Sequence, residues 1–456
     1  MRPAAEAEKL GIPSVVVTVP GFINVAKAAA RGAGVPGIRL AEYPGAVGID
    51  HAEIRAKVKS SLFDQIVAAL TDPVNEERTA SPAAWNAREI VCKGSLAEIN
   101  RYFAEREWTD GLPIIPPTPQ AIDEFLKYTD RDADETIAIL PQANLRATPR
   151  VIAANGVMAG CRPEHMPILV ALTEALGDER YNLNNIGTTW GIVPYLIING
   201  PIVKELGIHS EEGLVSRGPN PALGRAMGLI IRNIGGYKPG RSQMGTFGYP
   251  LPFAFAENEA ANPWEPLHVE RGFERNTSTV SIGSTLNWGF SPSPYTREDR
   301  AGAQTALELF CIEARRKPCL SLFAESGPKS FINDITFLIA PPVAKALAAG
   351  GLSKAAIKDY VWRNARVPLR ELEWELRYGL AEVHTVREKV ELGLFTKDFD
   401  VGSDDTVPII PSPDLINLVV CGDPGRNHIK TFDSGYTLLT TKAIKLPARW
   451  EQLPKG

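Results

Sequence analysis

The sequence predicts an α/β protein built from a small N-terminal unit with a Rossmann-like parallel sheet and a larger mixed α/β domain. Three observations favour this fold class. The chain has 456 residues, more than one compact core usually holds. Its 39 Gly and 37 Pro favour short elements joined by tight turns. Strand-like and helix-like segments alternate at its start, which is typical of parallel strands joined by right-handed crossovers.

Residues 1–72 are predicted to form the small unit. Gly11 is suited to ending the first helix, and the β-branched run that follows is typical of a buried parallel strand. Because two strands rarely form a stable sheet alone, we expect a partner chain or the rest of the protein to complete it. The expected elements are a helix over 4–10, a strand over 14–19, a helix over 22–31 and a strand over 37–43.

Residues 73–95 are predicted to be a linker, because they contain Pro and few large apolar side chains. The larger domain is expected over 96–456. A Pro-Ile-Ile-Pro phrase occurs at 113–116 and again at 408–411, which indicates either two related lobes or a chance likeness of Pro-rich loops. The expected elements are helices beginning at 96 and 119, helices over 151–159 and 166–176, a strand over 193–199, a helix opened by Asn220, a helix over 301–315, short helices over 340–392 and a strand over 415–420.

Composition and charge exclude several classes of function. The 49 basic and 53 acidic residues are well mixed, so no nucleic-acid partner is expected. No apolar run approaches the ~20 residues that a membrane span needs, and the N-terminus does not resemble a signal peptide. The five cysteines form no CxxC pair, which argues against a disulfide framework or a structural zinc site. We therefore expect a cytoplasmic protein that acts on a small molecule.

The densest polar segment of the chain is residues 256–272. Its carboxylates and its imidazole could form an acid/base pair or a site for a divalent metal. The alternative is a hydrogen-bond network that only fixes a long loop. The predicted catalytic or metal-binding residues are Glu257, Glu259 and His268, and the predicted substrate-binding residues of this segment are Asn258 and Arg271.

Cys161 is a candidate catalytic thiol. It follows Gly160 at a predicted helix break and precedes Arg162, whose charge would lower the pKa of the thiol. The alternative is a small buried side chain, which is the usual role of a free cysteine. The other four cysteines are expected in the core; they are Cys92, Cys311, Cys319 and Cys421.

Two further segments carry candidate substrate-binding groups. Asn185, Thr188 and Thr189 precede a predicted strand and could orient a polar substrate or could only cap turns. Arg217 and Arg225 flank a helix start and could hold a carboxylate, although helix capping by Asn220 explains the same pattern.

No nucleotide cofactor is expected, since the chain has no GxGxxG between a strand and a helix. The turn over 422–428 directly follows a predicted buried strand, where ligand sites of α/β proteins gather, but a turn without a ligand is the alternative.

Several phrases resemble the UGSC family, whose relatives include the selenoprotein subunits of glycine, sarcosine and betaine reductases. The resembling segments lie at 8–13, 108–113, 157–164, 198–201, 256–259 and 263–272. The resemblance implies thiol- or selenol-dependent reductive cleavage. In the family a Cys or Sec followed by Gly-Ser-Cys precedes the helix that here begins near Ala4, and this chain lacks it. A second difference is Trp190-Gly191, where relatives are expected to have His-Pro after two threonines.

The sequence therefore predicts an enzyme, or an enzyme subunit, that acts on a small polar substrate bearing a carboxylate or a C–N or C–S bond. A partner subunit is expected to supply the missing nucleophile, or the chain forms a homo-oligomer. Two alternatives remain open at this point. One is a metal-dependent lyase, hydratase or hydrolase that uses the 256–272 segment, and the other is a non-catalytic subunit of a hetero-oligomer.

Overall fold

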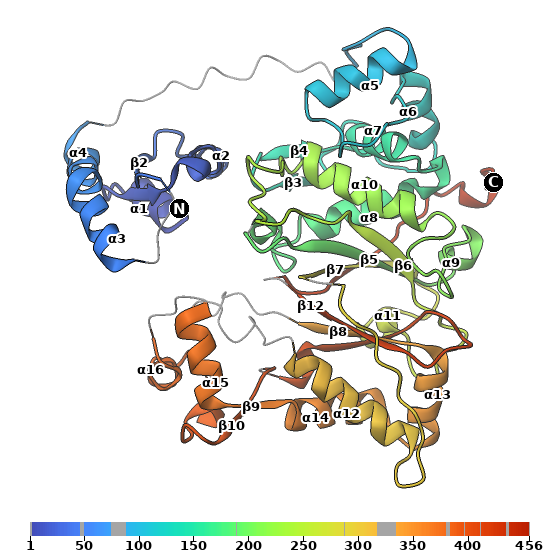
Figure 1. The fold of residues 1–456 in the computed structure, drawn as a ribbon. Helices are drawn as coiled ribbons and strands as arrows, with labels where there is room; N and C mark the ends of the chain where they lie inside the picture. Colours follow the sequence, from blue (N-terminus) through green and yellow to red (C-terminus); the bar gives the residue numbers. More distant parts are fainter. Residues whose placement is uncertain are drawn as a thin grey trace.

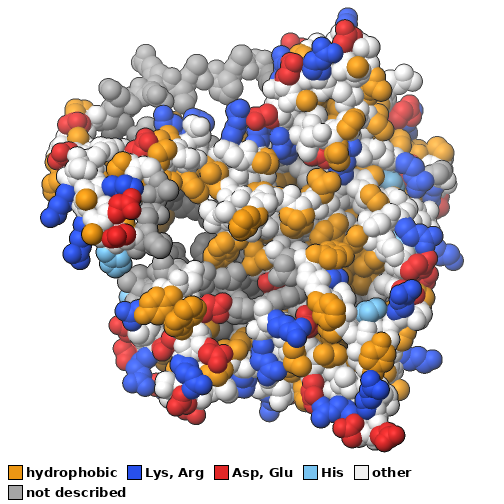
Figure 2. Space-filling view, in the orientation of Figure 1, with side chains coloured by type: hydrophobic (Ala, Val, Ile, Leu, Met, Phe, Trp, Pro, Cys, Tyr) orange, Lys and Arg blue, Asp and Glu red, His pale blue; other side chains and the backbone are white. Residues whose placement is uncertain are grey.

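The computed structural model confirms the predicted α/β class, with an N-terminal unit followed by a larger body (Figure 1). Residues 74–87, most of the predicted linker, lie outside the described residues. Lys and Arg are interspersed with Asp and Glu over the visible face (Figure 2). The structure describes residues 2–45, 50–73, 88–187, 189–286, 288–316, 334–379, 384–395, 397–410, 412–434 and 437–455.

The N-terminal unit contains the predicted pair of parallel strands, with Val15 opposite Arg39. Alternate residues of each strand face opposite sides, so Val16 packs with α1 and α2 while Val15 packs with α3 and α4. The described elements are α1 (Arg2–Lys9), β1 (Val15–Thr18), η1 (Pro20–Phe22), α2 (Ile23–Gly32), β2 (Arg39–Glu42), α3 (His51–Lys57), η2 (Val58–Leu62) and α4 (Phe63–Thr71).

The first lobe of the body is built on a sheet with the strand order β13-β7-β5-β6. β5 is parallel to β6 and antiparallel to β7. Helices α7, α8 and α10 cover its outer face (Figure 1). The elements are α5 (Leu96–Glu105), α6 (Pro119–Leu126), β3 (Ala138–Leu140), β4 (Leu145–Ala147), α7 (Pro149–Ala159), η3 (Pro163–His165), α8 (Met166–Leu176), η4 (Leu183–Gly187), β5 (Val193–Asn199), α9 (Ile202–Glu205), α10 (Asn220–Asn233), β6 (Phe253–Ala256), α11 (Leu267–Glu270), β7 (Thr279–Thr285) and β13 (Thr440–Ala443).

The second lobe repeats this arrangement with the strand order β11-β8-β12. β8 is parallel to β11 and antiparallel to β12, and α12, α13 and α14 cover the outer face (Figure 1). The elements are α12 (Gly302–Arg315), β8 (Ile335–Ile339), α13 (Pro341–Ala349), α14 (Lys354–Asn364), β9 (Arg366–Pro368), α15 (Leu369–Trp374), η6 (Glu375–Gly379), α16 (Val386–Glu391), η7 (Lys397–Phe399), β10 (Thr406–Pro408), η8 (Pro413–Leu415), β11 (Ile416–Val420) and β12 (Ile429–Asp433); η9 (Trp450–Gln452) follows β13.

The two sheets face each other, so the body has four layers in the order helices, sheet, sheet, helices. Along β5, Leu196 and Ile198 face the helices while Tyr195 and Ile197 face the other sheet. Central strands buried on both faces read as continuous apolar runs in the sequence. The region predicted as one larger domain thus consists of two lobes that share an apolar layer.

Side chains of complementary size join the lobes. Tyr195 lies opposite Gly283 in the first sheet, whereas Thr336 lies opposite Phe432 in the second. The hydroxyl of Tyr195 donates to Thr336 at 2.9 Å, and its ring centroid lies 5.0 Å from that of Phe432. A Cβ on Gly283 would lie 2.3 Å from the Tyr195 ring, so only glycine leaves room for this ring.

The repeated Pro-Ile-Ile-Pro phrases do not mark the related topology of the lobes. The first phrase leads into α6, whereas the second leads toward β11. They therefore lie at unrelated places in two lobes that nevertheless share the same arrangement of strands.

Candidate functional site

The carboxyl ends of the parallel strands meet at one edge of the body. The backbone N–H of Asn258, just after β6, donates to the carbonyl of Val420 at the end of β11, at 2.7 Å. The register places Asn199 and Glu257 at the end of the first parallel pair, and Cys421 follows the second. Ligand sites of α/β sheets gather at such strand ends.

Glu257 is buried and holds the polar segment against β5. Its Oε2 accepts hydrogen bonds from Asn199 Nδ2 at 2.7 Å and from the N–H of Leu267 at 2.8 Å. Its Oε1 accepts from Asn262 Nδ2 at 2.8 Å. Burial raises the pKa of Glu257, and the charge of Lys354 opposes this shift. The carboxyl group therefore resists ionisation although all three partners are donors.

Glu259 and His268, two of the predicted catalytic or metal-binding residues, lie close together. Glu259 Oε1 accepts from the N–H of Gly200 at 2.7 Å and from Asn199 Nδ2 at 3.0 Å. The same oxygen lies 3.6 Å from Nδ1 of the fully buried His268. Nε2 of His268 lies 3.2 Å from the carbonyl of Arg275, which only accepts, so Nε2 carries the proton. In the neutral ring the lone pair of Nδ1 faces the Glu259 carboxylate, whereas in the protonated ring Nδ1–H would pair with it.

The predicted divalent-metal site at Glu257, Glu259 and His268 does not form. Within the described ranges, no group of three or more His, Cys, Asp or Glu side chains is arranged to hold a metal ion. The physical reason is that the oxygens of Glu257 already accept from amide and backbone donors, and Nε2 of His268 points to a carbonyl.

Cys161 is a core residue, and the prediction that Arg162 lowers its pKa is wrong. Burial raises the pKa of the thiol to about 12. The guanidinium of Arg162 turns to Glu164 at 2.8 Å, while the thiol donates to the carbonyl of Ala222 in α10 at 3.4 Å. The Cys161 thiol therefore contacts α10, which covers the outer face of the sheet, whereas Glu257 contacts the end of strand β5. Cys319 lies outside the described residues, and Cys92 is half-buried rather than in the core.

The predicted carboxylate anchors hold carboxylates of the chain itself. Arg225 donates two hydrogen bonds of 2.9 Å to Asp110, and the exposed Arg217 pairs with Glu212. α10 begins at Asn220 with Pro219 as its N-cap, so the predicted N-cap is displaced by one residue.

The Asn220 side chain instead fixes a neighbouring loop. Its amide donates to the carbonyls of His209 and Leu214 and accepts from the N–H of His209. Asn220 therefore holds the loop over residues 207–219, which lies between α9 and α10.

The remaining predicted substrate-binding residues do not share one site with the acid/base pair. Asn258 accepts from the N–H of Ala261 at 3.2 Å, and Arg271 donates to Asn417 on β11. Asn185 is half-buried in η4 and Thr189 is exposed. Thr188 lies outside the described residues.

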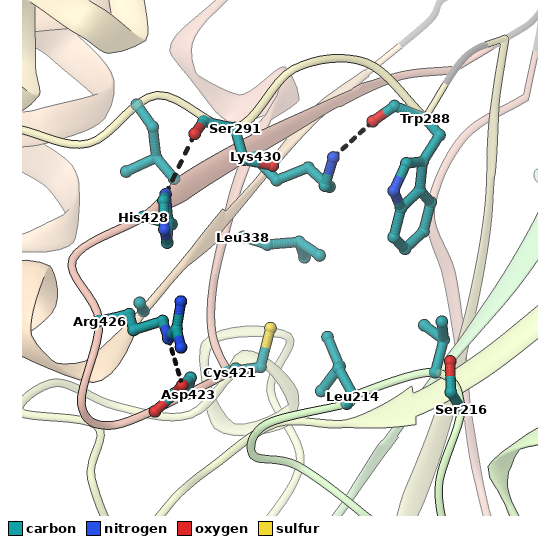
Figure 3. A pocket seen from close by; sticks show the side chains of 15 residues that line it. Leu214, Ser216, Trp288, Ser291, Leu338, Cys421, Asp423, Arg426, His428 and Lys430 are labelled. Carbon is teal, nitrogen blue, oxygen red and sulfur yellow. Dashed lines mark hydrogen bonds and ion pairs between the residues drawn. The ribbon is translucent and has the colours of Figure 1, made fainter.

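A pocket of about 290 Å³ lies at the carboxyl ends of β8 and β11, between the lobes. Figure 3 shows Arg426 and His428 on one side, Trp288 on the other, and the Cys421 sulfur between them. Leu214 comes from the 207–219 loop of the first lobe. Cys421, predicted to be a core residue, is 3% exposed and nevertheless lines this pocket.

Basic side chains border the pocket. Arg426 donates to Asp423 at 3.0 Å and is otherwise 71% exposed at its side chain. Lys430 donates to the carbonyl of Trp288 at 2.7 Å, and its ammonium lies 4.6 Å from the centroid of that ring. The Trp288 ring therefore carries a cation on its face, which suits an anionic or polarised ligand nearby.

His428 has one ring nitrogen fixed by the backbone. Nδ1 lies 3.1 Å from the carbonyl of Ser291 and 2.8 Å from Oγ of Ser293. Because the carbonyl only accepts, Nδ1 carries the proton in the neutral ring and Nε2 is an acceptor.

Burial raises the pKa of the Cys421 thiol well above its usual value, and the charge of Glu257 adds to this shift.

The sequence had one signal for the pocket, the turn over 422–428 directly after a buried strand. It had no signal for Trp288, which comes from the segment after β7, or for Leu214, which comes from the 207–219 loop of the first lobe. Those contacts depend on how two lobes pack, which periodicity along one segment does not encode.

Comparison with known proteins finds a family likeness in the N-terminal unit. Residues 1–72 match the model of the UGSC family. No curated protein and no solved structure matches the chain. Across the described residues, no helix has the length and apolar character needed to cross a membrane. Residues 1–72 of this chain are therefore similar to the UGSC family.

Proposed function

We propose that the chain is an enzyme, or a subunit of one, that acts on a small carboxylate-bearing molecule bound in the pocket between the lobes. The observation that carries this proposal is the placement of Arg426 and His428 together at one end of that pocket. A guanidinium matches the two oxygens of a carboxylate with parallel N–H donors. Asp423 occupies one side of Arg426 and leaves its other N–H groups for a ligand.

The opposite end suits an apolar body. Trp288 and Leu214 lie there, with the Lys430 ammonium against the Trp288 ring, and Leu338 lies between the two ends (Figure 3). The volume of about 290 Å³ lies at the lower limit for ligand sites. A molecule smaller than a typical drug, with a carboxylate at one end and an apolar group at the other, fits this distribution of side chains.

His428 is the proposed group for proton transfer. With Nδ1 held by the Ser291 carbonyl, Nε2 can accept a proton from a bound molecule or return one. Imidazole is the side chain most often used for this step near neutral pH.

The UGSC match supports a finer proposal, that the reaction is a thiol- or selenol-dependent reductive cleavage. Residues 1–72 contain no cysteine. The proposal places the attacking thiol or selenol on a partner subunit. Purification of the tagged full chain from its natural source tests this. We expect a co-purified subunit bearing Cys or Sec followed by Gly-Ser-Cys; a chain that is active alone would contradict the partner.

Binding of benzoate, compared with its uncharged isostere benzamide, tests the pocket by calorimetry on the full chain. We expect benzoate to bind and benzamide to bind at least about tenfold more weakly, because a charge-assisted hydrogen bond is worth about 1.5–3 kcal/mol. Arg426→Gln should remove the preference. The control Arg363→Gln replaces another exposed arginine, paired with Asp359 in α14, and should leave binding unchanged. Equal binding of the two probes would refute the carboxylate assignment.

A further inference from the structure

Three fully buried polar atoms gather at the edge of the first lobe without hydrogen-bond partners among the described residues. They are Oδ1 of Asn199, Oγ1 of Thr279 and Nδ1 of His268. Each side chain is 0% exposed. A buried polar atom left unpaired is costly, and native proteins usually satisfy it with a partner or a bound species.

The three atoms border the same place. Asn199 at the end of β5 is the direct cross-strand neighbour of Thr279 at the start of β7. The amide of Asn199 contacts Glu259 Oε1 at 3.0 Å, and the same carboxylate oxygen lies 3.6 Å from His268 Nδ1. Asn199 and His268 therefore approach the same carboxylate oxygen, and Thr279 is the cross-strand neighbour of Asn199.

All of these atoms can act as acceptors. Nδ2 of Asn199 lies between the carboxylates of Glu257 and Glu259, which fixes the amide so that Oδ1 is the free end. In the neutral ring of His268, Nε2 donates to the Arg275 carbonyl and the lone pair of Nδ1 is the acceptor.

A hydroxyl, an amide oxygen, an imidazole nitrogen and a carboxylate oxygen together match a small cation that donates several N–H bonds. We propose that this edge of the first lobe binds an ammonium group, either the free ammonium ion or the protonated primary amine of a small molecule. The side chain of Glu259 is 24% exposed, which connects the site to solvent.

The second lobe has no counterpart of this site. Its register places Ala340 where the first lobe has Asn199, and Cys421 where it has Glu257. Neither residue carries a side-chain oxygen. The acceptors are therefore a property of the first lobe, and the proposal does not depend on the carboxylate pocket of the second.

Thermal unfolding of the full chain in different chloride salts at equal ionic strength tests the proposal. Ammonium should raise the unfolding temperature more than sodium, potassium or tetramethylammonium, because only ammonium can donate to all the acceptors. A response to methylammonium as well would indicate that the site takes an amine of a larger molecule; a response to ammonium alone would indicate the free ion.

Thr279→Val removes one acceptor without changing the side-chain shape. We expect it to weaken ammonium binding about tenfold, the loss of one hydrogen bond to a charged group, while the protein without ammonium becomes no less stable, because an unpaired hydroxyl leaves the core. The control Thr173→Val removes an equally buried hydroxyl that donates to Leu169 within α8, and should keep the full ammonium response.

Glu259→Gln provides a second variant that keeps the shape and removes the charge, and it should abolish the ammonium response. An equal response to potassium, or a Thr279→Val protein that responds like the wild type, would overturn the proposal and leave water as the species that satisfies these atoms. Benzoate binding is measured separately, so failure here and failure of the proposed function are distinguishable.

Discussion

The two lobes share one arrangement of strands but use its carboxyl end differently. In the first lobe Asn199 ends β5 and Glu257 follows β6. The 256–272 segment folds back and buries both side chains. In the second lobe Ala340 and Cys421 stand at those places, and a pocket remains open between the lobes. The comparison teaches that equivalent strand ends with different side chains form a polar cluster in one lobe and border a pocket in the other.

The largest expected effect comes from the interface that both lobes share. Gly283→Ala would place a Cβ 2.3 Å from the buried Tyr195 ring, so we expect a loss of about 3 kcal/mol, the upper part of the range for overpacked cores. Urea unfolding measures this. Gly379→Ala, where the nearest atom is a flexible Glu375 carbon at 3.6 Å, should change stability by less than about 0.5 kcal/mol. Similar effects of both variants would show that the lobes do not interlock here.

A half-buried ion pair of the first lobe joins Arg225 to Asp110, whose side chains are 18% and 13% exposed. Asp110→Asn should lower the free energy of unfolding by about 2 kcal/mol at neutral pH, because Arg225 loses its charged partner. This loss is smaller than that expected on breaking a deeply buried ion pair. Asp359→Asn, which breaks the exposed pair with Arg363, should cost no more than about 0.5 kcal/mol.

The same variant predicts a pH dependence. Burial alone would raise the pKa of Asp110, but the hydrogen bonds and charge of Arg225 outweigh it and hold that pKa below the usual 3.8. A lowered carboxyl pKa stabilises the fold above pH 3.8 and loses this effect as the pH falls through the folded-state value. The difference between wild type and Asp110→Asn should therefore shrink at acidic pH; a constant difference would contradict the assignment.

The reactivity of the cysteines tests whether the pocket at the carboxyl ends of β8 and β11 is accessible to a small reagent. Both Cys161 and Cys421 have pKa values raised by burial, so both should react slowly with iodoacetamide, but Cys421 lines the pocket. We expect Cys421 to react about tenfold faster than Cys161, because access also limits thiol reactivity. Peptide mass analysis gives the rates, with half-buried Cys92 as a faster reference. Saturating benzoate should slow Cys421 alone, and equal protection of Cys161 would argue for a global effect.

The smallest expected effect concerns the loop that the first lobe contributes to the pocket. Leu214→Ala removes part of an apolar wall, so we expect benzoate binding to weaken about fivefold, on the order of 1 kcal/mol for partial loss of buried apolar area. Calorimetry measures it, and Leu251→Ala removes an exposed leucine as the control. Unchanged binding in Leu214→Ala would show that the ligand sits only on the second lobe.

Much of the local structure could be predicted from the sequence, because it depends on neighbours in the chain. The strand over 193–199 and the helix over 166–176 occur with the predicted bounds, and α7 ends at Ala159 as expected. Glu259 and His268, predicted as site residues from the same segment of the sequence, also lie close together in the structure. The metal site and the activated Cys161 were wrong because each required the direction of a side chain, which the fold decides.

The sequence by itself determined the α/β class, the position of the apolar strands and the likeness of residues 1–72 to the UGSC family. Only the tertiary structure decided that two sheets pack face to face, that Arg225 and Arg217 hold the carboxylates of the chain itself, and that Cys421 lines a pocket instead of Cys161. The physical reason is that burial and pairing of a charged or thiol group depend on atoms brought together from distant segments, whereas helix and strand periodicity depends on residues only a few positions apart.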